Sequence, residues 1–244
     1  MNLLREQPRL QVRELATRFN VSEMTIRRDM IVLEQEGVLV RTYGGGAALS
    51  PSLLPVGVSQ QPVNPRQAAI GRLAASLVSP GQTIMVDTGT TALEVARHLP
   101  LDPSITVATT SLHIAQEMSA TPLNVLLLGG FVHKEFHSLY GPLTEHMLHI
   151  LHVDTLFIGC NGADSEDGFY AGDLLLFSQV QAMVRIADRI VVVSESDKFG
   201  RKAFVRYARL DEIHTLVTDN DLSQQDRQNL QERGVSVLIA DETA

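Results

Sequence analysis

Cysteine, long apolar runs and sequence repeats are scarce or absent in this chain of 244 residues. The single cysteine, Cys160, cannot form an intramolecular disulfide, which fits a reducing compartment. Apolar runs such as Val125–Leu128 fall far short of the roughly 18 residues that a membrane-spanning helix needs. The first residues, Met1–Glu6, lack the basic stretch and apolar core of a secretory signal. We therefore expect a soluble, cytoplasmic protein.

Positive charge is also scarce, because 28 acidic residues outnumber 20 basic ones and give a net charge of −8. This average argues against nucleic-acid binding, since phosphates repel an acidic surface. The charges are unevenly distributed, however. Residues 1–48 hold seven arginines and six acidic residues, a net of +1, whereas residues 49–244 carry a net of −9. No lysine precedes Lys134, and arginine can both pair with phosphate and read guanine.

Composition divides the chain into three parts. With 44% hydrophobic residues, it has enough apolar material for one large domain or two modest ones. Residues 1–49 have a helical pattern, and the four prolines of residues 50–65 favour an extended linker. From residue 66 to 244, β-branched runs alternate with helical segments, which predicts a Rossmann-like α/β domain with a mostly parallel sheet. Its expected strands are residues 83–86, 105–108, 125–128, 155–158, 190–193, 215–218 and 235–239.

Residues 11–46 have the pattern of a winged helix-turn-helix. Helices are predicted over residues 11–19 and 22–36, with Ser22 as the N-cap of the second helix. A strand over residues 38–42 and a flexible glycine tip at residues 44–46 complete the predicted wing. In such a domain the second helix enters the major groove of DNA.

The second helix of this pattern has a buried arc and an exposed arc. Arg28 lies opposite the apolar arc, and Thr25 and Arg27 also lie in the exposed first turns that would face DNA. Two adjacent arginines, taken alone, more often belong to an ordinary solvated face. The apolar residues expected to face the core are Ile26, Met30 and Leu33.

Polar residues cluster at the carboxyl ends of five predicted strands, the edge at which parallel sheets bind ligands. The N–H groups and hydroxyls of Gly89–Thr91 can hold a phosphate, Lys198 can add positive charge, and Asp87 can accept from sugar hydroxyls. Each motif also has a purely structural interpretation as a turn, an N-cap or a surface loop. The residues expected to bind an effector are Asp87, Gly89, Thr90, Thr91, Thr110, Ser111, Gly129, Gly130, Asn161, Gly162 and Lys198.

The chain resembles the DeoR family of bacterial transcription regulators over nearly its whole length. The matching strings are Val-Arg-Glu-Leu-Ala at 12–16, Thr-Ile-Arg-Arg-Asp at 25–29, Arg-Thr-Tyr-Gly-Gly at 41–45, Leu-Gly-Gly at 128–130, Ser-Leu-Tyr-Gly-Pro at 138–142 and Asp-Lys-Phe-Gly at 197–200. The resemblance implies a reader of operator DNA and an effector domain that binds a phosphorylated sugar or related metabolite. The residues expected in DNA contact are Ser22, Thr25, Arg27, Arg28, Arg41 and Tyr43.

Four departures from the family pattern bear on these expectations. Thr110 stands where Asn is common, His133 where Arg is common, and residues 175–177 where an acidic pair precedes a small residue. Losing an amide, a fixed charge and two carboxylates predicts an unusual effector or weakened phosphate sensing. Only about ten residues precede the string at 12–16, so the first helix of the reader is expected to be truncated and DNA binding weakened.

Other candidate sites give weaker signals. Cys160 is expected to be a small buried residue rather than a nucleophile. A serine-hydrolase elbow, a Walker loop and a dinucleotide fingerprint are absent, so we expect no cofactor. Five histidines cluster in sequence, but their spacing does not favour convergence on one metal ion: His133, His137, His146, His149 and His152.

The sequence thus predicts a transcription regulator rather than an enzyme, and a repressor of carbohydrate-metabolism genes whose operator affinity responds to a phosphorylated sugar. A homodimer or larger assembly is expected, because one short reader makes few phosphate contacts. Two alternatives remain open. One is a sugar-phosphate isomerase or deaminase that uses Asp87 as a base. The other is a regulator that has lost its ligand and responds to a protein partner.

Overall fold

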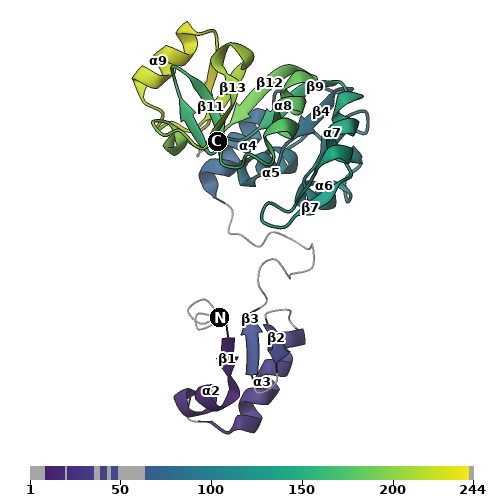
Figure 1. Cartoon of the computed structure of the whole chain (residues 1–244), viewed down its shortest axis with the longest axis vertical. Helices are drawn as coiled ribbons and strands as arrows, with labels where there is room; N and C mark the ends of the chain where they lie inside the picture. The colour runs from purple at the N-terminus through teal and green to yellow at the C-terminus, as the bar shows by residue number, and fades with distance from the viewer. Residues whose placement is uncertain (1–8, 20, 36–38, 43–44, 49–63, 242–244) are drawn as a thin grey trace. The chain divides into compact units, whose positions relative to one another are not determined.

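The computed structural model describes residues 9–19, 21–35, 39–42, 45–48 and 64–241 (Figure 1). The chain divides into an N-terminal unit, residues 1–57, and a C-terminal unit, residues 58–244. The predicted linker lies outside the described residues, except for its last two positions. Within the described residues, no helix has the length and apolar character needed to cross a membrane.

The N-terminal unit contains two helices and an antiparallel sheet with the strand order β1-β3-β2. Val12 and Leu15 pack with Ile26 and Met30 in a small core, as predicted for the last two, whereas the Leu33 side chain lies outside what the structure describes. The elements are β1 (Arg9–Gln11), α2 (Val12–Phe19), α3 (Glu23–Gln35), β2 (Leu39–Thr42) and β3 (Gly45–Ala48).

The wing of this unit differs from the prediction in its glycines. Gly45 and Gly46 are not part of a free tip, because they open β3 and pair with Thr42 and Arg41 of β2. β3 lies between β1 and β2, so neighbours on both sides hold these glycines in the sheet. Glycine has low β propensity, so the sequence did not indicate β3. The three-residue strand β1 was not predicted either. Gly44 lies outside the described residues.

Seven parallel strands form the main sheet of the C-terminal unit, which confirms the predicted Rossmann-like fold class. Their order is β15-β14-β12-β9-β4-β5-β6, so the chain builds outward from β4 on one side and from β9 on the other. Each strand overlaps one predicted run: β4 (Thr83–Val86), β5 (Thr106–Thr109), β6 (Asn124–Leu127), β9 (Val153–Ile158), β12 (Ala187–Val193), β14 (Thr215–Thr218) and β15 (Ser236–Ile239).

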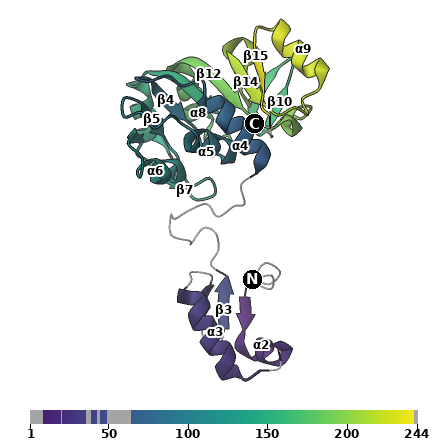
Figure 2. The same ribbon diagram turned by 180° about the vertical axis from the view of Figure 1, so that it is seen from behind.

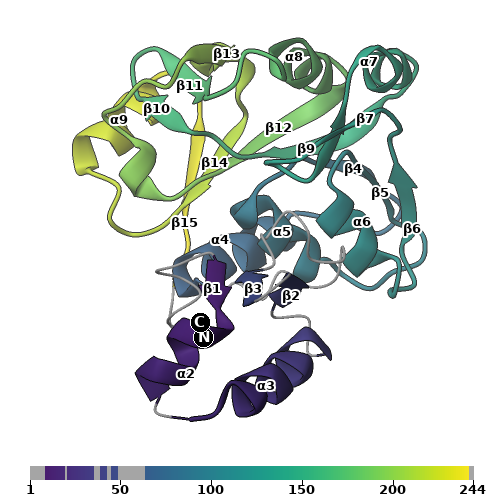
Figure 3. The same cartoon turned by 60° about the horizontal axis from the view of Figure 1, so that its bottom comes forward.

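Helices cover both faces of this sheet, as Figure 3 shows. Strand side chains alternate between two cores, since Ile84 and Val86 belong to one core and Met85 to the other. The first core contains side chains of α4 (Pro65–Ala75), α5 (Thr90–Arg97) and α6 (Leu112–Met118). The second contains side chains of α7 (Pro142–His149), α8 (Phe177–Arg185) and α9 (Gln224–Glu232).

The helix α4, which lies beside α5 in Figures 1 and 2, begins where the linker was predicted to end. Pro65 is its first residue, since a proline there loses no helical hydrogen bond. The Asn64 side chain accepts a hydrogen bond from the Arg66 N–H at 3.0 Å and caps the helix. The predicted linker therefore extends two residues too far.

Five short strands outside the main sheet were not predicted. They form the hairpin β7 (Phe131–His133) and β8 (Ser138–Tyr140), and an antiparallel sheet of β10 (Gly162–Asp164), β11 (Gly168–Ala171) and β13 (Val205–Arg209). His133 is the last residue of β7.

Candidate functional site

The first turns of α3 present an exposed polar surface. The Ser22 hydroxyl accepts a hydrogen bond from the Thr25 N–H at 3.1 Å, as an N-cap does, and lies 2.9 Å from the Thr25 hydroxyl. Arg27 and Arg28 are both exposed. The Arg27 guanidinium lies 3.6 Å from the Glu23 carboxylate, with both side chains half exposed. Such a pair is weak, so Arg27 can exchange Glu23 for a phosphate.

The structure brings four of the six predicted DNA-binding residues together on the N-terminal part of α3. Arg41 lies on β2, opposite Gly46 of β3. Tyr43 lies outside the described residues.

A cavity of about 250 Å³ lies at the carboxyl edge of the main sheet, where the strand order changes direction between β4 and β9. Open α/β sheets bind ligands at this point, because neighbouring loops there lead to opposite sides and leave a crevice. The loops after β4, β9 and β12 line one side, and the β7–β8 hairpin and α8 line another. Six of the eleven predicted effector-binding residues line it: Asp87, Gly89, Thr90, Thr91, Asn161 and Lys198.

The other five predicted residues do not line this cavity, and three of them have structural roles of their own. The Ser111 hydroxyl caps α6 by accepting from the Ile114 N–H at 3.3 Å. A Cβ on Gly130 would lie 2.5 Å from the Tyr140 carbonyl oxygen, so glycine permits a close backbone approach. Gly162 meets the backbone of residue 201 in the same way. The residues outside the lining are Thr110, Ser111, Gly129, Gly130 and Gly162.

Burial controls the ionisation of three side chains in the cavity. Burial raises the pKa of Asp87 to about 6, because its effect is larger than that of the hydrogen bond from the Thr88 N–H, which lowers the pKa. It also raises the pKa of the Cys160 thiol to about 11, and that of Tyr207 well above its usual range. Cys160 is therefore a protonated thiol at neutral pH, which disfavours a nucleophilic role.

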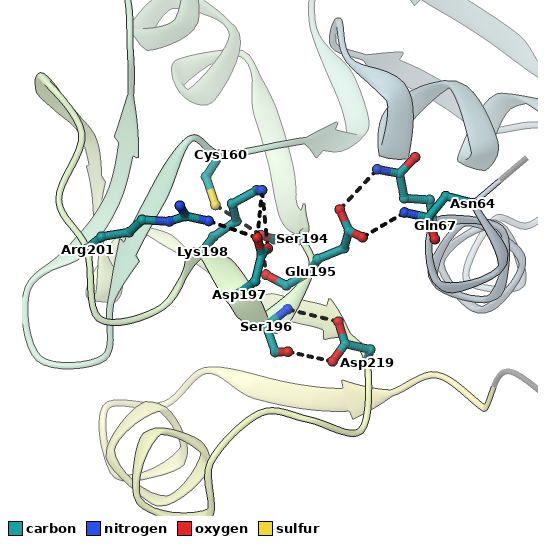
Figure 4. Close-up of polar contacts among 10 residues, drawn as sticks. All are labelled: Asn64, Gln67, Cys160, Ser194, Glu195, Ser196, Asp197, Lys198, Arg201 and Asp219. Atoms are coloured by element: carbon teal, nitrogen blue, oxygen red, sulfur yellow. Dashed lines mark hydrogen bonds and ion pairs between the residues drawn. The ribbon is translucent and has the colours of Figure 1, made fainter. Parts of the chain in front are cut away.

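Two features of the cavity suit an anion. Gly89, with φ at 118°, precedes Thr90 and Thr91, and no described side chain caps this end of α5, so its first N–H groups are available to a ligand. Lys198 ends the short helix η2 (Ser196–Lys198), and its ammonium lies 3.2 Å from Asp197. Asp197 also pairs with Arg201 at 2.8 Å (Figure 4).

A further polar contact joins the cavity to the first turn of α4, and sequence reasoning missed it. The Glu195 carboxylate accepts from the Asn64 side-chain amide at 2.9 Å and from that of Gln67 at 3.0 Å (Figure 4). Glu195 and Gln67 both line the cavity. The partners lie more than 120 residues apart in sequence, so no local motif could have indicated the contact.

His133 and Asp173 meet beside the cavity. The Phe136 N–H donates to His133 Nδ1 at 3.4 Å, which leaves the proton on Nε2, 3.3 Å from the Asp173 carboxylate. Asp173 lines the cavity, as does Leu176, which stands in the segment where the family pattern has acidic residues. The described residues contain no cluster of ligands suited to a metal ion.

Two family descriptions match the chain, a DeoR-like helix-turn-helix domain over residues 1–52 and a DeoR C-terminal sensor domain over residues 64–220. The HTH-type transcriptional regulator GlpR of Haloferax volcanii is 32% identical over 93% of this chain and 90% of its own length. The HTH-type transcriptional repressor GlcR of Bacillus subtilis is 30% identical over 99% of this chain and 94% of its own. The chain is also similar to a solved structure of ribose 5-phosphate isomerase A from Methanocaldococcus jannaschii. The matched region covers 55% of this chain and 53% of the isomerase chain, at 16% identity and a TM-score of 0.40.

Proposed function

Because this chain belongs to the DeoR family of transcriptional regulators, we propose that it represses carbohydrate-metabolism genes and that a phosphorylated sugar modulates its operator affinity. The cavity carries this proposal, since it combines an open helix N-terminus, an ammonium group and a partly buried carboxyl of raised pKa at the switch point of the sheet. A phosphate is expected at Thr90 and Thr91, with Lys198 supplying charge, and sugar hydroxyls are expected at Asp87 and Asn161.

The exposed face of α3 supports the DNA half of the proposal. Thr25, Arg27 and Arg28 can reach base edges and phosphates from one helical turn, with Ser22 at its start. Arg41 on β2 is also expected in DNA contact, as is Tyr43, which lies outside the described residues. Few cations contribute, so a single copy would release few counterions and bind weakly. We therefore propose a homo-oligomer, a dimer or tetramer, that presents at least two readers to the operator.

Helix α4 offers a route from the cavity to the DNA-binding unit, because it is the first described element after the segment that joins the two units. Glu195 holds the first turn of α4 through the side chains of Asn64 and Gln67, and both Glu195 and Gln67 line the cavity. A sugar hydroxyl that donates to Glu195 competes with Asn64 and Gln67. Ligand binding would thereby shift the populations of two α4 arrangements, which changes operator affinity by linkage.

The test is a titration of the protein with its own upstream DNA, without ligand and with ribose 5-phosphate, glucose 6-phosphate or glycerol 3-phosphate. We expect specific binding in the ligand-free state and a 5- to 150-fold change with one of these probes, the usual range of allosteric coupling. Absence of specific DNA binding would overturn the reader assignment. Specific binding that no phosphorylated probe alters or occupies would overturn the effector assignment.

One observation favours the enzyme alternative, namely a carboxyl with a pKa of about 6 in a cavity, which is a common property of a general base. We propose a regulatory role instead, because the Cys160 thiol that also lines the cavity is protonated and the family descriptions that match the chain are those of transcription regulators. Turnover of pentose and hexosamine phosphates separates the two, and we expect none above the level of an Asp87→Asn variant.

A further inference from the structure

Ser138 and Gln179 each bury a polar atom that has no hydrogen-bond partner among the described residues. The atoms are Ser138 Oγ and Gln179 Oε1, on residues that are only 1% and 4% exposed. Both residues line the cavity, on the side formed by β8 and α8. Buried polar atoms are almost always paired, because leaving one unpaired is costly. Two such atoms on one wall therefore point to a polar ligand.

The orientation of Gln179 follows from its neighbour on β8. Its Nε2 donates to the Leu139 carbonyl oxygen at 3.2 Å, and the Leu139 N–H donates in turn to the Thr110 carbonyl at 2.8 Å. Because the Leu139 carbonyl can only accept, the amide cannot flip without losing this bond. Gln179 Oε1 is thus left as an acceptor, whereas the Ser138 hydroxyl can both donate and accept.

We infer that Ser138 and Gln179 form a hydroxyl-binding subsite of the cavity, which selects polyhydroxylated phosphates over phosphate alone. The inference rests on the proposed function and adds two residues that carry specificity. The phosphate group of a sugar phosphate is a monoester dianion that has only acceptors and cannot satisfy Gln179 Oε1, whereas a sugar hydroxyl donates to it and also pairs with Ser138. Neither side chain of this subsite is charged, unlike Lys198.

Ser138→Ala tests the subsite, because it removes a hydroxyl that has no described partner. The probe is ribose 5-phosphate or glucose 6-phosphate, whichever binds the wild type with higher affinity. Calorimetric titration should show that the variant binds this probe about three- to tenfold more weakly than the wild type does. Binding of inorganic phosphate should not change. The melting temperature of the ligand-free variant should equal or exceed that of the wild type, since no hydrogen bond is lost.

Thr218→Val is a matched control, because Thr218 Oγ1 is also buried without a described partner but lies outside the cavity lining. It should leave both ligand affinities unchanged. Sugar-phosphate binding that Ser138→Ala does not weaken would overturn the subsite while leaving the proposed function intact. A melting temperature several degrees below the wild type would do the same, since it would show that the hydroxyl is structural. Absence of binding by every phosphorylated probe to the wild type would overturn both.

Discussion

The two units of this chain hold their functional groups in opposite environments. In the N-terminal unit, Thr25, Arg27 and Arg28 project from a helix whose other side packs in a small core, and water surrounds them. In the C-terminal unit, Asp87 and Ser138 lie between a parallel sheet and its covering elements. Exposed charges act through their number and position, whereas burial sets the ionisation and pairing of enclosed groups.

This difference predicts how each unit responds to substitution. Removing an exposed arginine should cost DNA affinity and almost no stability, because surface substitutions rarely change the free energy of unfolding by more than about 0.5 kcal/mol. Removing an enclosed polar group should change ligand affinity and stability together, often in opposite directions. Four predictions test this contrast, in order of decreasing expected effect.

Arg28→Ala is expected to weaken operator binding about 10- to 100-fold, roughly 1–3 kcal/mol, because an arginine in the major groove pairs with guanine or phosphate. Fluorescence anisotropy with labelled operator DNA measures the change. Sugar-phosphate affinity and the free energy of unfolding should stay at wild-type values. Arg227→Ala on α9 is the control, since it removes an exposed arginine from the other unit. Equal operator affinity in the two variants would remove Arg28 from the interface.

The stability of the C-terminal unit should fall as the pH rises from 4.5 to 7.5, by about 2 kcal/mol from Asp87 alone. Its folded pKa of about 6 exceeds the ordinary value of 3.8, so the folded state keeps a proton that the unfolded state has released. Urea unfolding at both pH values measures this, and Asp87→Asn should flatten the difference. In Asp211→Asn, which alters an exposed carboxylate, the decrease should persist. A wild-type slope in Asp87→Asn would contradict the buried-carboxyl assignment.

Lys198→Gln is expected to weaken sugar-phosphate binding about tenfold, near 1.4 kcal/mol, through loss of one charge-assisted contact. Operator affinity without ligand should not change. Lys202→Gln is the matched control, because that ammonium pairs with Asp167 at 3.0 Å and lies outside the cavity lining. If the two variants bind the ligand equally well, Lys198 does not hold the phosphate.

Asn64→Ser should reduce the effect of the ligand on operator affinity about threefold, without a comparable change in ligand affinity. Serine can still cap α4 but lacks the amide that donates to Glu195. One of the two hydrogen bonds between Glu195 and the start of α4 is therefore lost. Operator titrations with and without sugar phosphate measure the ratio. Asn124→Ser, an exposed change at the start of β6, should leave the ratio unaltered. An unaltered ratio in Asn64→Ser would exclude the α4 route.

Local patterns in the sequence were sufficient for a large part of this protein. β-branched runs located all seven strands of the parallel sheet, and the N-cap at Ser22 and the buried arc with Ile26 and Met30 were predicted correctly. The family resemblance, drawn from short ordered strings, is confirmed by the match of both family descriptions. These features depend on residues that lie close together in sequence, so periodicity and spacing reveal them.

Strand order was decided by the tertiary structure alone. The sequence correctly indicated that polar loops share the carboxyl edge of one sheet. No local sequence pattern, however, indicates which strands are neighbours in that sheet. Because β4 and β9 are central, the loops after them, with Asp87 and Asn161, meet at the cavity. β5 and β6 lie towards one edge, so Thr110 and Gly129 remain outside the lining.

The side chains that complete the site also come from contacts over long sequence distances. Glu195 meets α4 across more than 120 residues, and Gln179 meets Leu139 across 40. The sequence by itself determined where the seven strands of the parallel sheet lie and which family the chain resembles, because those properties are local. Packing decided which polar groups are enclosed, and with it the raised pKa of Asp87 and the unpaired atoms of Ser138 and Gln179, because burial exists only in the folded chain.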